Sequence, residues 1–267
     1  MNKMKPAGHL FISDFDKTLS FDDGGYLLSE SIGISREEFD RKVLDLANKS
    51  FLQQGAELSY LIENDSDYRG KISKRDFFEI GKKIKLKGHV RELVSILGKG
   101  IDNDRFKFFV NSAAPREMIV ASLQDVLDEE SIFGTEFEFD EKGVSTRIKN
   151  VNAGYGKVRT LDMLHKKEKV PYDKILYVGD GVSDINVMLH LRSLDGYSIS
   201  ASKSEYLGHI ARRSVISDDA LAFLIPVLED ILSYDVQKIR KFFLDRELII
   251  QDWTRSKIDL ISITGAS

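Results

Sequence analysis

HLFISDFDKTL, residues 9–19, joins a short apolar run to two aspartates that are separated by a single residue. The run from His9 to Ser13 is typical of a strand buried in a parallel sheet, because both faces of such a strand are covered and apolar residues need not alternate with polar ones. Asp14 and Asp16 follow the strand directly. Since ligands of an open parallel sheet bind beyond the carboxyl ends of its strands, this segment predicts a sheet and a site at its edge.

Patterns of strand and helix alternate from residue 88 onward. The further predicted strands are 106–110, 175–178, 197–200 and 214–216, with a hairpin formed by 133–139 and 143–148. The predicted helices are 89–97, 115–127, 156–164 and 182–191, followed by two helices after Asp218, the second with apolar residues from Val236 to Ile250. This alternation predicts the α/β fold class, with a doubly wound, Rossmann-like, mostly parallel sheet covered by helices on both faces.

Residues 21–87 interrupt the alternation and carry no strand pattern. Ser35 and Glu38 have the spacing of a capping box and predict the start of one amphipathic helix. The other predicted helices of this segment are 51–62 and 73–84. An interruption of this size is most simply a second, small domain. We therefore expect a helical cap of residues 21–87 over a core made of 1–20 and 88–267, which includes the C-terminal helices.

Composition excludes several classes of site. The chain has 267 residues, a net charge of −4 and no cysteine, so a disulfide framework, a thiolate metal site and a cysteine nucleophile are excluded. The mild acidity gives no electrostatic reason to expect a nucleic acid partner. No apolar run approaches the length of a membrane span, and the apolar residues behind the basic N-terminus are too few for a signal peptide. We therefore expect a cytoplasmic protein that binds neither nucleic acid nor membrane.

Chemically useful side chains follow the other predicted strands as well. They are Asn111 and Ser112 after the second strand, Lys157 at the start of the helix behind the hairpin, and Asp180 and Asp184 after the strand that ends at Val178. Because the carboxyl ends of parallel strands meet at one edge, we expect these side chains to lie together with Asp14 and Asp16. Carboxylate oxygens are the ligands that Mg²⁺ prefers in proteins, so this edge predicts a magnesium site.

The same set of residues has the logic of phosphoryl transfer. A metal ion neutralises a phosphate oxygen, so an anionic carboxylate can approach and form an acyl-phosphate that water later hydrolyses. A second carboxyl group two residues away can protonate the leaving alcohol and then deprotonate the attacking water. A hydroxyl and an ammonium, as on Ser112 and Lys157, can bind the equatorial phosphate oxygens. A dehalogenase or a phosphonate hydrolase has no alkoxide to protonate, so Asp16 favours a phosphate ester.

The sequence resembles the haloacid dehalogenase-like hydrolase superfamily, and specifically its phosphoserine-phosphatase-like branch with a helical C1-type cap. The resemblance spans about residues 9–217 and rests on four motifs in the family's order: Asp14-Phe15-Asp16-Lys17-Thr18-Leu19, Asn111-Ser112-Ala113, Gly156-Lys157-Val158 and Gly179-Asp180-Gly181-Val182-Ser183-Asp184. It implies that Asp14 is the nucleophile and Asp16 the general acid and base. It also implies that Mg²⁺ is held by Asp14, the backbone carbonyl of Asp16 and Asp180, with Asp184 as a further ligand or as a partner of one. Phosphate would then be held by Ser112, Lys157 and Thr18.

Three departures from that branch leave the substrate open. The second motif continues Ser112-Ala113-Ala114-Pro115 where those enzymes usually have Ser-Gly-Gly, and the fourth reads Gly-Val-Ser-Asp where they commonly have Gly-Ala-Asn-Asp. Asp23 stands where they carry a substrate-reading glutamate, so it is a candidate for substrate selection with a shorter side chain. We expect a small phosphorylated metabolite as the substrate, with a phosphoprotein as the alternative, and serine phosphate does not follow from these motifs.

Other interpretations of these residues stay open. A phosphomutase or phosphotransferase of the same superfamily uses similar residues and passes phosphate to a sugar rather than to water. A non-catalytic binding protein on this scaffold is a further alternative, although every chemically required position is filled. The basic residues Arg69, Lys71, Lys74 and Arg75 form either a solvated cap face or a contact for an anionic substrate. The apolar stripe of the last helix packs on the body or forms a dimer interface, so the oligomeric state is left open.

Overall fold

The computed structural model of the protein describes residues 8–48, 53–251 and 253. The chain divides after Leu224 into two compact units. The first unit contains the sheet and all the predicted site residues, and the second contains the described residues from Ile225 onward. Within the described residues, no helix is both long enough and apolar enough to cross a membrane.

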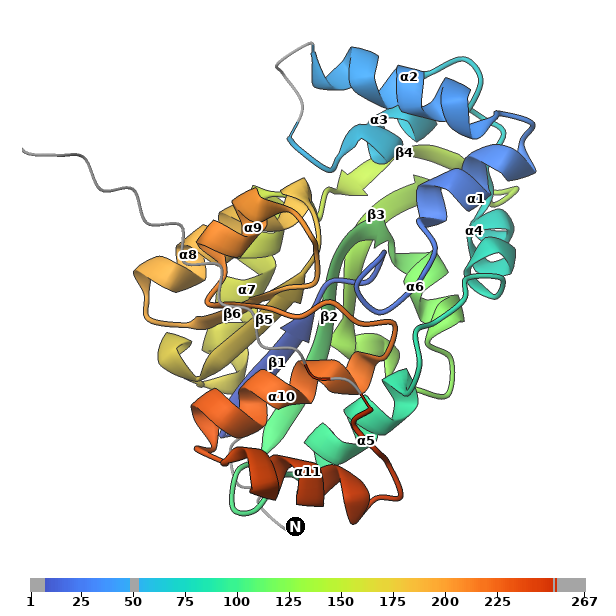
Figure 1. The fold of residues 1–267 in the computed structure, drawn as a ribbon. Helices are drawn as coiled ribbons and strands as arrows, with labels where there is room; N and C mark the ends of the chain where they lie inside the picture. The colour runs from blue at the N-terminus through green and yellow to red at the C-terminus, as the bar shows by residue number, and fades with distance from the viewer. Residues whose placement is uncertain (1–7, 49–52, 252, 254–267) are drawn as a thin grey trace, which may run out of the picture. The chain divides into compact units, whose positions relative to one another are not determined.

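A sheet of seven strands forms the centre of the first unit (Figure 1). The strands are β1 (His9–Ser13), β2 (Phe106–Pro115), β3 (Ile132–Phe139), β4 (Ser145–Asn150), β5 (Ile175–Gly179), β6 (Tyr197–Ser200) and β7 (Arg213–Ser214). Their order across the sheet is β4-β3-β2-β1-β5-β6-β7. Every neighbouring pair is parallel except β3 and β4, which form the predicted hairpin. The predicted α/β fold with a mostly parallel sheet is confirmed.

Strand β1 stands where the direction of strand addition reverses. The chain adds β2 and β3 on one side of β1 and later adds β5, β6 and β7 on the other side. Ser13 lies opposite Val110 of β2 and opposite Val178 of β5. The residues that follow Ser13, Val110 and Val178 therefore start at the same level. This edge is the topological switch point, the usual place for a ligand in such a sheet.

Helices cover both faces of the sheet (Figure 1). On one face lie α7 (Tyr155–Glu168), α8 (Ile185–Ser193) and α9 (Glu205–Ile210), whose apolar residues form a buried cluster with Ile12, Phe109 and Tyr177 of the strands. Helices α5 (Val90–Lys99) and α6 (Arg116–Ser122) pack on β2 and β3. Burial of these apolar side chains is the main stabilising contribution to the layered arrangement.

Residues 21–87 are part of the first unit, lie between β1 and α5 in the chain, and contain four described helices. They are α1 (Gly24–Ser31), α2 (Arg36–Ala47), α3 (Glu57–Asn64) and α4 (Lys74–Gly81). The capping box predicted at Ser35 forms only in part, because Ser35 accepts a hydrogen bond from the Glu38 amide but receives no return bond to its own amide. A complete box forms instead between Ser73 and Asp76 at the start of α4.

These four helices are bonded to the rest of the unit at both ends of the segment. The amide of Phe21 donates to Lys85 and the amide of Lys87 donates to Leu19, so the two connections to the sheet run side by side. On the other side, the amide and hydroxyl of Ser145 in β4 both donate to the Ile72 carbonyl, each at 2.9 Å. Helices α3 and α4 thus rest on the hairpin and on α6.

The observed elements differ from the predicted ones mainly at their ends. Strand β2 continues to Pro115, and α6 ends at Ser122 because the chain turns there and Asp125 adopts a left-handed conformation with φ of 63°. The predicted helix 51–62 begins partly outside the described residues, and α3 starts only at Glu57. Helix α9 carries too short an apolar pattern to be predicted, and the structure adds it.

The second unit is helical. Helix α10 (Leu224–Pro226) begins at the division and leads into one π-helical turn (Val227–Ile231), and α11 covers Val236–Leu244. The prediction that the last helix extends to Ile250 is wrong, because Glu247 adopts a left-handed conformation with φ of 61° that ends it. Within this unit the rings of Tyr234 and Phe242 meet edge to face at 6.4 Å.

Candidate active site

The predicted site residues emerge from three adjacent strand ends at the switch point. Asp14 follows β1, and its amide donates to the Val178 carbonyl of β5 at 2.8 Å, so the sheet ladder continues one residue beyond the strand. Ser112 lies in the neighbouring β2, and Asp180 directly follows β5. Asp14 and Ser112 are buried. The parallel register therefore brings together residues that are up to 166 positions apart in the sequence (14 to 180).

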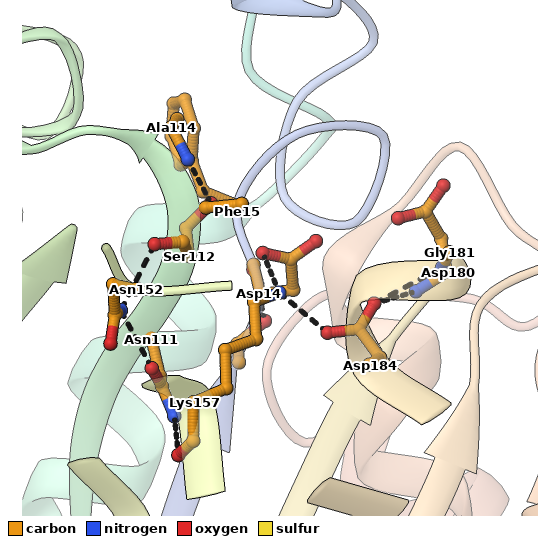
Figure 2. A network of polar contacts seen from close by, with 12 residues as sticks. Asp14, Phe15, Asn111, Ser112, Ala114, Asn152, Lys157, Asp180, Gly181 and Asp184 are labelled. Atoms are coloured by element: carbon orange, nitrogen blue, oxygen red, sulfur yellow. Dashed lines mark hydrogen bonds and ion pairs between the residues drawn. The ribbon is translucent and has the colours of Figure 1, made fainter. Parts of the chain in front are cut away.

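Lys157 reaches this edge from the first turn of α7. Figure 2 shows its side chain between two carboxylates: Lys157 Nζ donates to Asp14 Oδ1 at 2.8 Å and to Asp184 Oδ1 at 2.6 Å. The side chains of Lys157 and Asp184 have no exposed area, and that of Asp14 is 5% exposed. Burial by itself lowers the pKa of Lys157, but the charges and hydrogen bonds of the two aspartates outweigh it and raise that pKa above its usual value. The ammonium is therefore charged at neutral pH.

Asp184 is held from every side. Its Oδ2 accepts from the amides of Asp180 and Gly181 at 3.1 and 3.0 Å, and its Oδ1 accepts from Lys157 and from the Tyr177 hydroxyl, the latter at 2.5 Å. Gly179 allows this close approach, because a Cβ at that position would collide with the Asp184 carboxylate. The Gly-Asp-Gly sequence thus fits a turn that wraps around the Asp184 side chain.

The carboxylate of Asp180 differs from that of Asp184 in its hydrogen bonding. Within the described residues, no protein group donates to its carboxylate, although its amide is bonded to Asp184. Burial, followed by the nearby charges of Asp14 and Asp184, raises the pKa of Asp180 to about 8. Burial and the Asp184 charge likewise raise the pKa of Asp14, against the effect of Lys157. Burial and the neighbouring negative charges therefore disfavour the ionised forms of Asp14 and Asp180.

This excess of buried negative charge fits a divalent cation. Asp14, Asp180 and Asp184 each offer a carboxylate oxygen, and these oxygens lie within 4.8 Å of one another. One ammonium, that of Lys157, stands against three carboxylates in the group that we name the buried charge cluster: the buried Asp14, Lys157 and Asp184 and the half-buried Asp180. Oxygen donors suit Mg²⁺. Because four donors already engage Asp184, the oxygens with spare capacity belong to Asp14 and Asp180.

Asp16 lies in the turn after β1, next to the buried charge cluster. Its Oδ1 accepts a hydrogen bond from the Gly24 amide at 3.2 Å. Burial, together with the charges of Asp23 and Asp14, raises the pKa of Asp16 well above its usual value. A carboxyl group whose pKa is raised keeps its proton to higher pH than usual, which suits a general acid.

The two hydroxyl residues of the predicted site differ in their surroundings. Ser112 Oγ accepts from the Ala114 amide at 3.3 Å. Thr18 is buried in the turn that carries Asp16, and within the described residues its Oγ1 is buried without a hydrogen-bond partner. A buried hydroxyl without a partner is uncommon and calls for an explanation such as a ligand or a water molecule.

Asn152 was missed by the sequence analysis although it joins two of the motifs. Its Nδ2 donates to Asn111 Oδ1 at 2.8 Å and to the Ser112 carbonyl at 3.0 Å, and its Oδ1 accepts from Thr160 of α7 at 2.7 Å. Asn111 in turn donates to the Lys157 carbonyl at 3.0 Å. In the sequence Asn152 looks like an ordinary turn residue, because its partners lie in other elements.

Tyr177 was placed in a buried strand by the sequence but not in the site. Its ring lies in the apolar cluster beneath α7 and α8, and its hydroxyl reaches Asp184. A signal was available: a tyrosine inside an otherwise aliphatic strand needs a partner for its hydroxyl. Since Tyr177 stands two residues before the glycine of the Gly-Asp-Gly turn, the partner could have been sought there.

Asp23 lies on the outer side of Asp16. It caps α1 through a bond from the Gly25 amide at 3.0 Å and forms an ion pair with Lys17 at 2.7 Å. A cavity of about 120 Å³ opens here, which we name the rim pocket. It is lined by Lys17, Phe21, Asp22, Asp23, Tyr26, Leu27 and Arg36. Two cations, two carboxylates and two aromatic rings thus surround a small space near the start of α1.

Comparison with known proteins agrees with this fold. The sequence pattern described as haloacid dehalogenase-like hydrolase matches residues 11–189. A solved hydrolase of that family from Salmonella enterica subsp. enterica serovar Typhi aligns with a TM-score of 0.64 at 18% identity, over 84% of this chain and 73% of that one. A phosphoserine phosphatase with a phospho-aspartyl intermediate analogue aligns with a TM-score of 0.62 at 18% identity, over 85% of this chain and 99% of that one.

A gene product of Archaeoglobus fulgidus aligns with a TM-score of 0.65 at 16% identity, over 92% of this chain and 88% of that one. No curated protein sequence matches the chain. At these identities the solved structures show a shared fold. The matched sequence pattern, by contrast, covers more than half of the chain and includes the segments that carry Asp14, Ser112, Lys157 and Asp184.

Proposed function

The chain belongs to the haloacid dehalogenase-like hydrolase family, and from this premise and the geometry of the site we propose that it is a Mg²⁺-dependent phosphomonoester hydrolase. The observation that carries the proposal is the buried Asp14 carboxylate, paired with Lys157 at 2.8 Å and followed two residues later by a carboxyl group whose pKa is raised. This pair of carboxyl groups in unlike environments suits a nucleophile and a general acid.

The proposed reaction has two steps. Lys157 engages Asp14 Oδ1, which leaves Oδ2 as the atom that attacks phosphorus. The bond from phosphorus to the alcohol oxygen breaks, and protonated Asp16 gives its proton to that oxygen. In the second step Asp16, now a carboxylate, accepts a proton from the water that attacks the aspartyl-phosphate. Inorganic phosphate leaves, and both Asp14 and the protonated Asp16 are restored.

Asp14, Asp180 and the backbone carbonyl of Asp16 are the proposed ligands of Mg²⁺. We assign Asp184 mainly to holding Lys157 and the Gly-Asp-Gly turn, because its two oxygens already accept four hydrogen bonds. When bound, the ion would neutralise charge on the phosphate and on these carboxylates. Burial, followed by the negative charges of Asp14 and Asp184, raises the pKa of Asp180 to about 8, and a cation at this place would relieve that charge.

Ser112 and Lys157 are the proposed donors to the equatorial phosphate oxygens. Both lie at the strand edge beside Asp14, and Lys157 stays charged. Thr18 was predicted to join them. Its buried hydroxyl without a described partner is compatible with such a contact, although the side chain has no exposed area.

We further propose that residues 21–87 act as the cap over a core of 1–20 and 88–267, and that the rim pocket receives the leaving group. The pocket is lined by Lys17, which follows Asp16 in the chain, and by Asp23, whose charge acts on Asp16, the residue that protonates the leaving oxygen in this scheme. A small phosphorylated metabolite is the substrate class that we propose for it. Asp23 lines the pocket and keeps its proposed role in substrate selection, now as half of an ion pair with Lys17. A cytoplasmic location remains a prediction.

A panel of phosphate esters, including an aryl phosphate, tests the proposal. Purified protein with Mg²⁺ is expected to release inorganic phosphate from at least one ester, and Asp14→Asn is expected to release none. Rapid acid quenching should trap phosphate on the wild-type chain as a hydroxylamine-sensitive acyl-phosphate. A phosphomutase would instead yield a second phosphorylated product. Absence of turnover on the whole panel, in protein that binds Mg²⁺, would overturn the hydrolase assignment and favour the non-catalytic alternative.

A further inference from the structure

Tyr177 stands directly beneath the buried charge cluster. It lies in β5 with no exposed area, and its hydroxyl donates to Asp184 Oδ1 at 2.5 Å and approaches the Asn111 carbonyl at 3.4 Å. The ring is packed among apolar residues of β1, β2, α7 and α8. The position of the hydroxyl is therefore fixed, because a close-packed ring of this size cannot change its orientation.

The bond from Tyr177 completes the support of Asp184. Oδ2 is fixed by two backbone amides of the Gly-Asp-Gly turn, whereas Oδ1 is shared between Tyr177 and Lys157. Lys157 has the longer side chain of the two, with more rotatable bonds, and its ammonium is shared with Asp14. Without the tyrosine, Oδ1 would be held by Lys157 alone. The orientation of the Asp184 carboxylate, and with it the position of the Lys157 ammonium, would then be less well defined.

We propose that Tyr177 is a positioning residue that fixes Asp184 and, through it, the places of Lys157 and of the Asp180 turn. This inference rests on the proposed function, since it assigns Tyr177 a part in shaping the metal and phosphate site. It does not make Tyr177 a catalytic residue, because its hydroxyl contacts Asp184 and the Asn111 carbonyl rather than a proposed metal ligand or the phosphate. Asp184 in turn holds the Asp180 turn and Lys157, which is bonded to Asp14, so its displacement would reach both carboxylate ligands proposed for Mg²⁺. Residues that orient metal ligands commonly change affinity or activity by about 10–100-fold when they are removed.

The chain offers a matched control for loss of the hydroxyl. Tyr68 is also fully buried, and its hydroxyl is bonded to Ser29 Oγ at 2.7 Å within the proposed cap. Tyr68→Phe and Tyr177→Phe each delete one buried hydroxyl and keep the ring. Both variants are expected to unfold at a lower denaturant concentration than wild type, because each removes one hydrogen bond to a buried side chain. Only Tyr177→Phe should alter the site.

The test is a titration of the metal-free protein with Mn²⁺, in which electron paramagnetic resonance measures the concentration of free ion. Tyr177→Phe is expected to weaken Mn²⁺ affinity by about 10-fold or more, and Tyr68→Phe to leave it within twofold of wild type. With a substrate from the panel, Tyr177→Phe should lower kcat with little change in KM. Equal Mn²⁺ affinity and kcat in Tyr177→Phe and wild type would overturn the inference.

A double-mutant cycle keeps the inference apart from the proposed function. In an Asp184→Asn background, Tyr177→Phe should have little further effect on Mn²⁺ affinity, because the tyrosine acts through Asp184. Additive effects of the two substitutions would show that Tyr177 acts elsewhere. The affinity measurements need no turnover. If wild type hydrolyses no ester, the hydrolase proposal fails, and the Mn²⁺ affinities still decide whether Tyr177 is a positioning residue.

Discussion

Two groups of charged residues lie near Asp16, and they differ in their contact with water. In the buried charge cluster, the paired side chains of Asp14, Lys157 and Asp184 are 5% exposed or less. In the rim pocket, Lys17 and Asp23 form an ion pair of similar length but are 49% and 26% exposed. Coulomb interactions are several times stronger in the interior than at the surface. We therefore expect the ion pairs of the buried charge cluster to contribute to catalysis, and the ion pair of the rim pocket to contribute only to substrate selection.

Replacing Lys157 should give the largest effect. Lys157→Met leaves Asp14 and Asp184 buried without their ammonium, and removing one partner of a buried pair typically costs about 3–5 kcal/mol. Loss of a positive charge beside the phosphate should also lower kcat by about 10²–10³-fold. Urea unfolding and phosphate release measure the two effects.

Lys17→Met is the matched control for Lys157→Met. It breaks an ion pair of almost the same length, 2.7 Å, but exposed pairs contribute only about 0–1 kcal/mol. Its unfolding midpoint should stay close to that of wild type. Equal destabilisation by the two substitutions would contradict the distinction between the buried and the exposed group.

Asp16→Asn should reveal the acid that lies near the two groups. The amide keeps the shape but cannot donate a proton to the leaving oxygen, so hydrolysis of an alkyl phosphate should fall by about 10²-fold. An aryl phosphate has a leaving group that needs less protonation, so its hydrolysis should fall much less. Steady-state rates on both esters test this, and an equal loss on both would mean that Asp16 serves another purpose.

The sequence was informative wherever function follows strand order. A buried apolar run that ends in Asp14 predicted both the central strand and the site, because a parallel sheet brings its strand ends to one edge. Asp180 was found for the same reason, since it follows the neighbouring strand β5. Ser112 was found because the strand predicted for 106–110 ends just before it, although β2 continues to Pro115. Lys157 was predicted at the correct helix start as a phosphate ligand, but its two carboxylate partners, 143 and 27 residues away, were not.

Side-chain partners formed by tertiary packing could not be predicted. Asn152 and Tyr177 carry ordinary local signals, and their roles depend on elements that are distant in the sequence. The capping boxes show the same limit at short range. Ser35 and Glu38 have the favoured residue types, yet Glu38 pairs with Arg41 at 3.8 Å and leaves the box incomplete. Ser73 closes a box with an aspartate, the less favoured partner.

The pH dependence of stability should expose the buried group in the absence of metal. The pKa of Asp180 is about 8 in the folded protein, above its usual value of about 4 in an unfolded chain. The folded state therefore binds the proton more tightly, and stability should fall as the pH rises through this window and level off above it. Asp180→Asn should melt at a higher temperature than metal-free wild type at pH 8, with little difference near pH 4.

Mg²⁺ provides the control for this measurement. Saturating ion should raise the melting temperature of wild type most at high pH, where Asp180 is ionised, and should raise that of Asp180→Asn much less. Calorimetry or fluorescence-detected melting at several pH values is sufficient. If the melting temperatures of the two metal-free proteins depend on pH in the same way, the raised pKa of Asp180 does not contribute to the pH dependence of stability, and the prediction is wrong.

Arg36→Ala should give the smallest effect and test the rim pocket. Arg36 lines that pocket, its guanidinium lies over the Tyr26 ring at 5.3 Å, and its side chain is 57% exposed. Because it touches only the leaving-group end of the substrate in this scheme, KM should rise a few-fold while kcat changes little. Arg147→Ala removes another exposed arginine, paired with Glu138 outside the pocket, and should change neither constant. If Arg36→Ala lowers kcat as Lys157→Met does, the exposed charges share in the chemistry, and the contrast between the two groups does not hold.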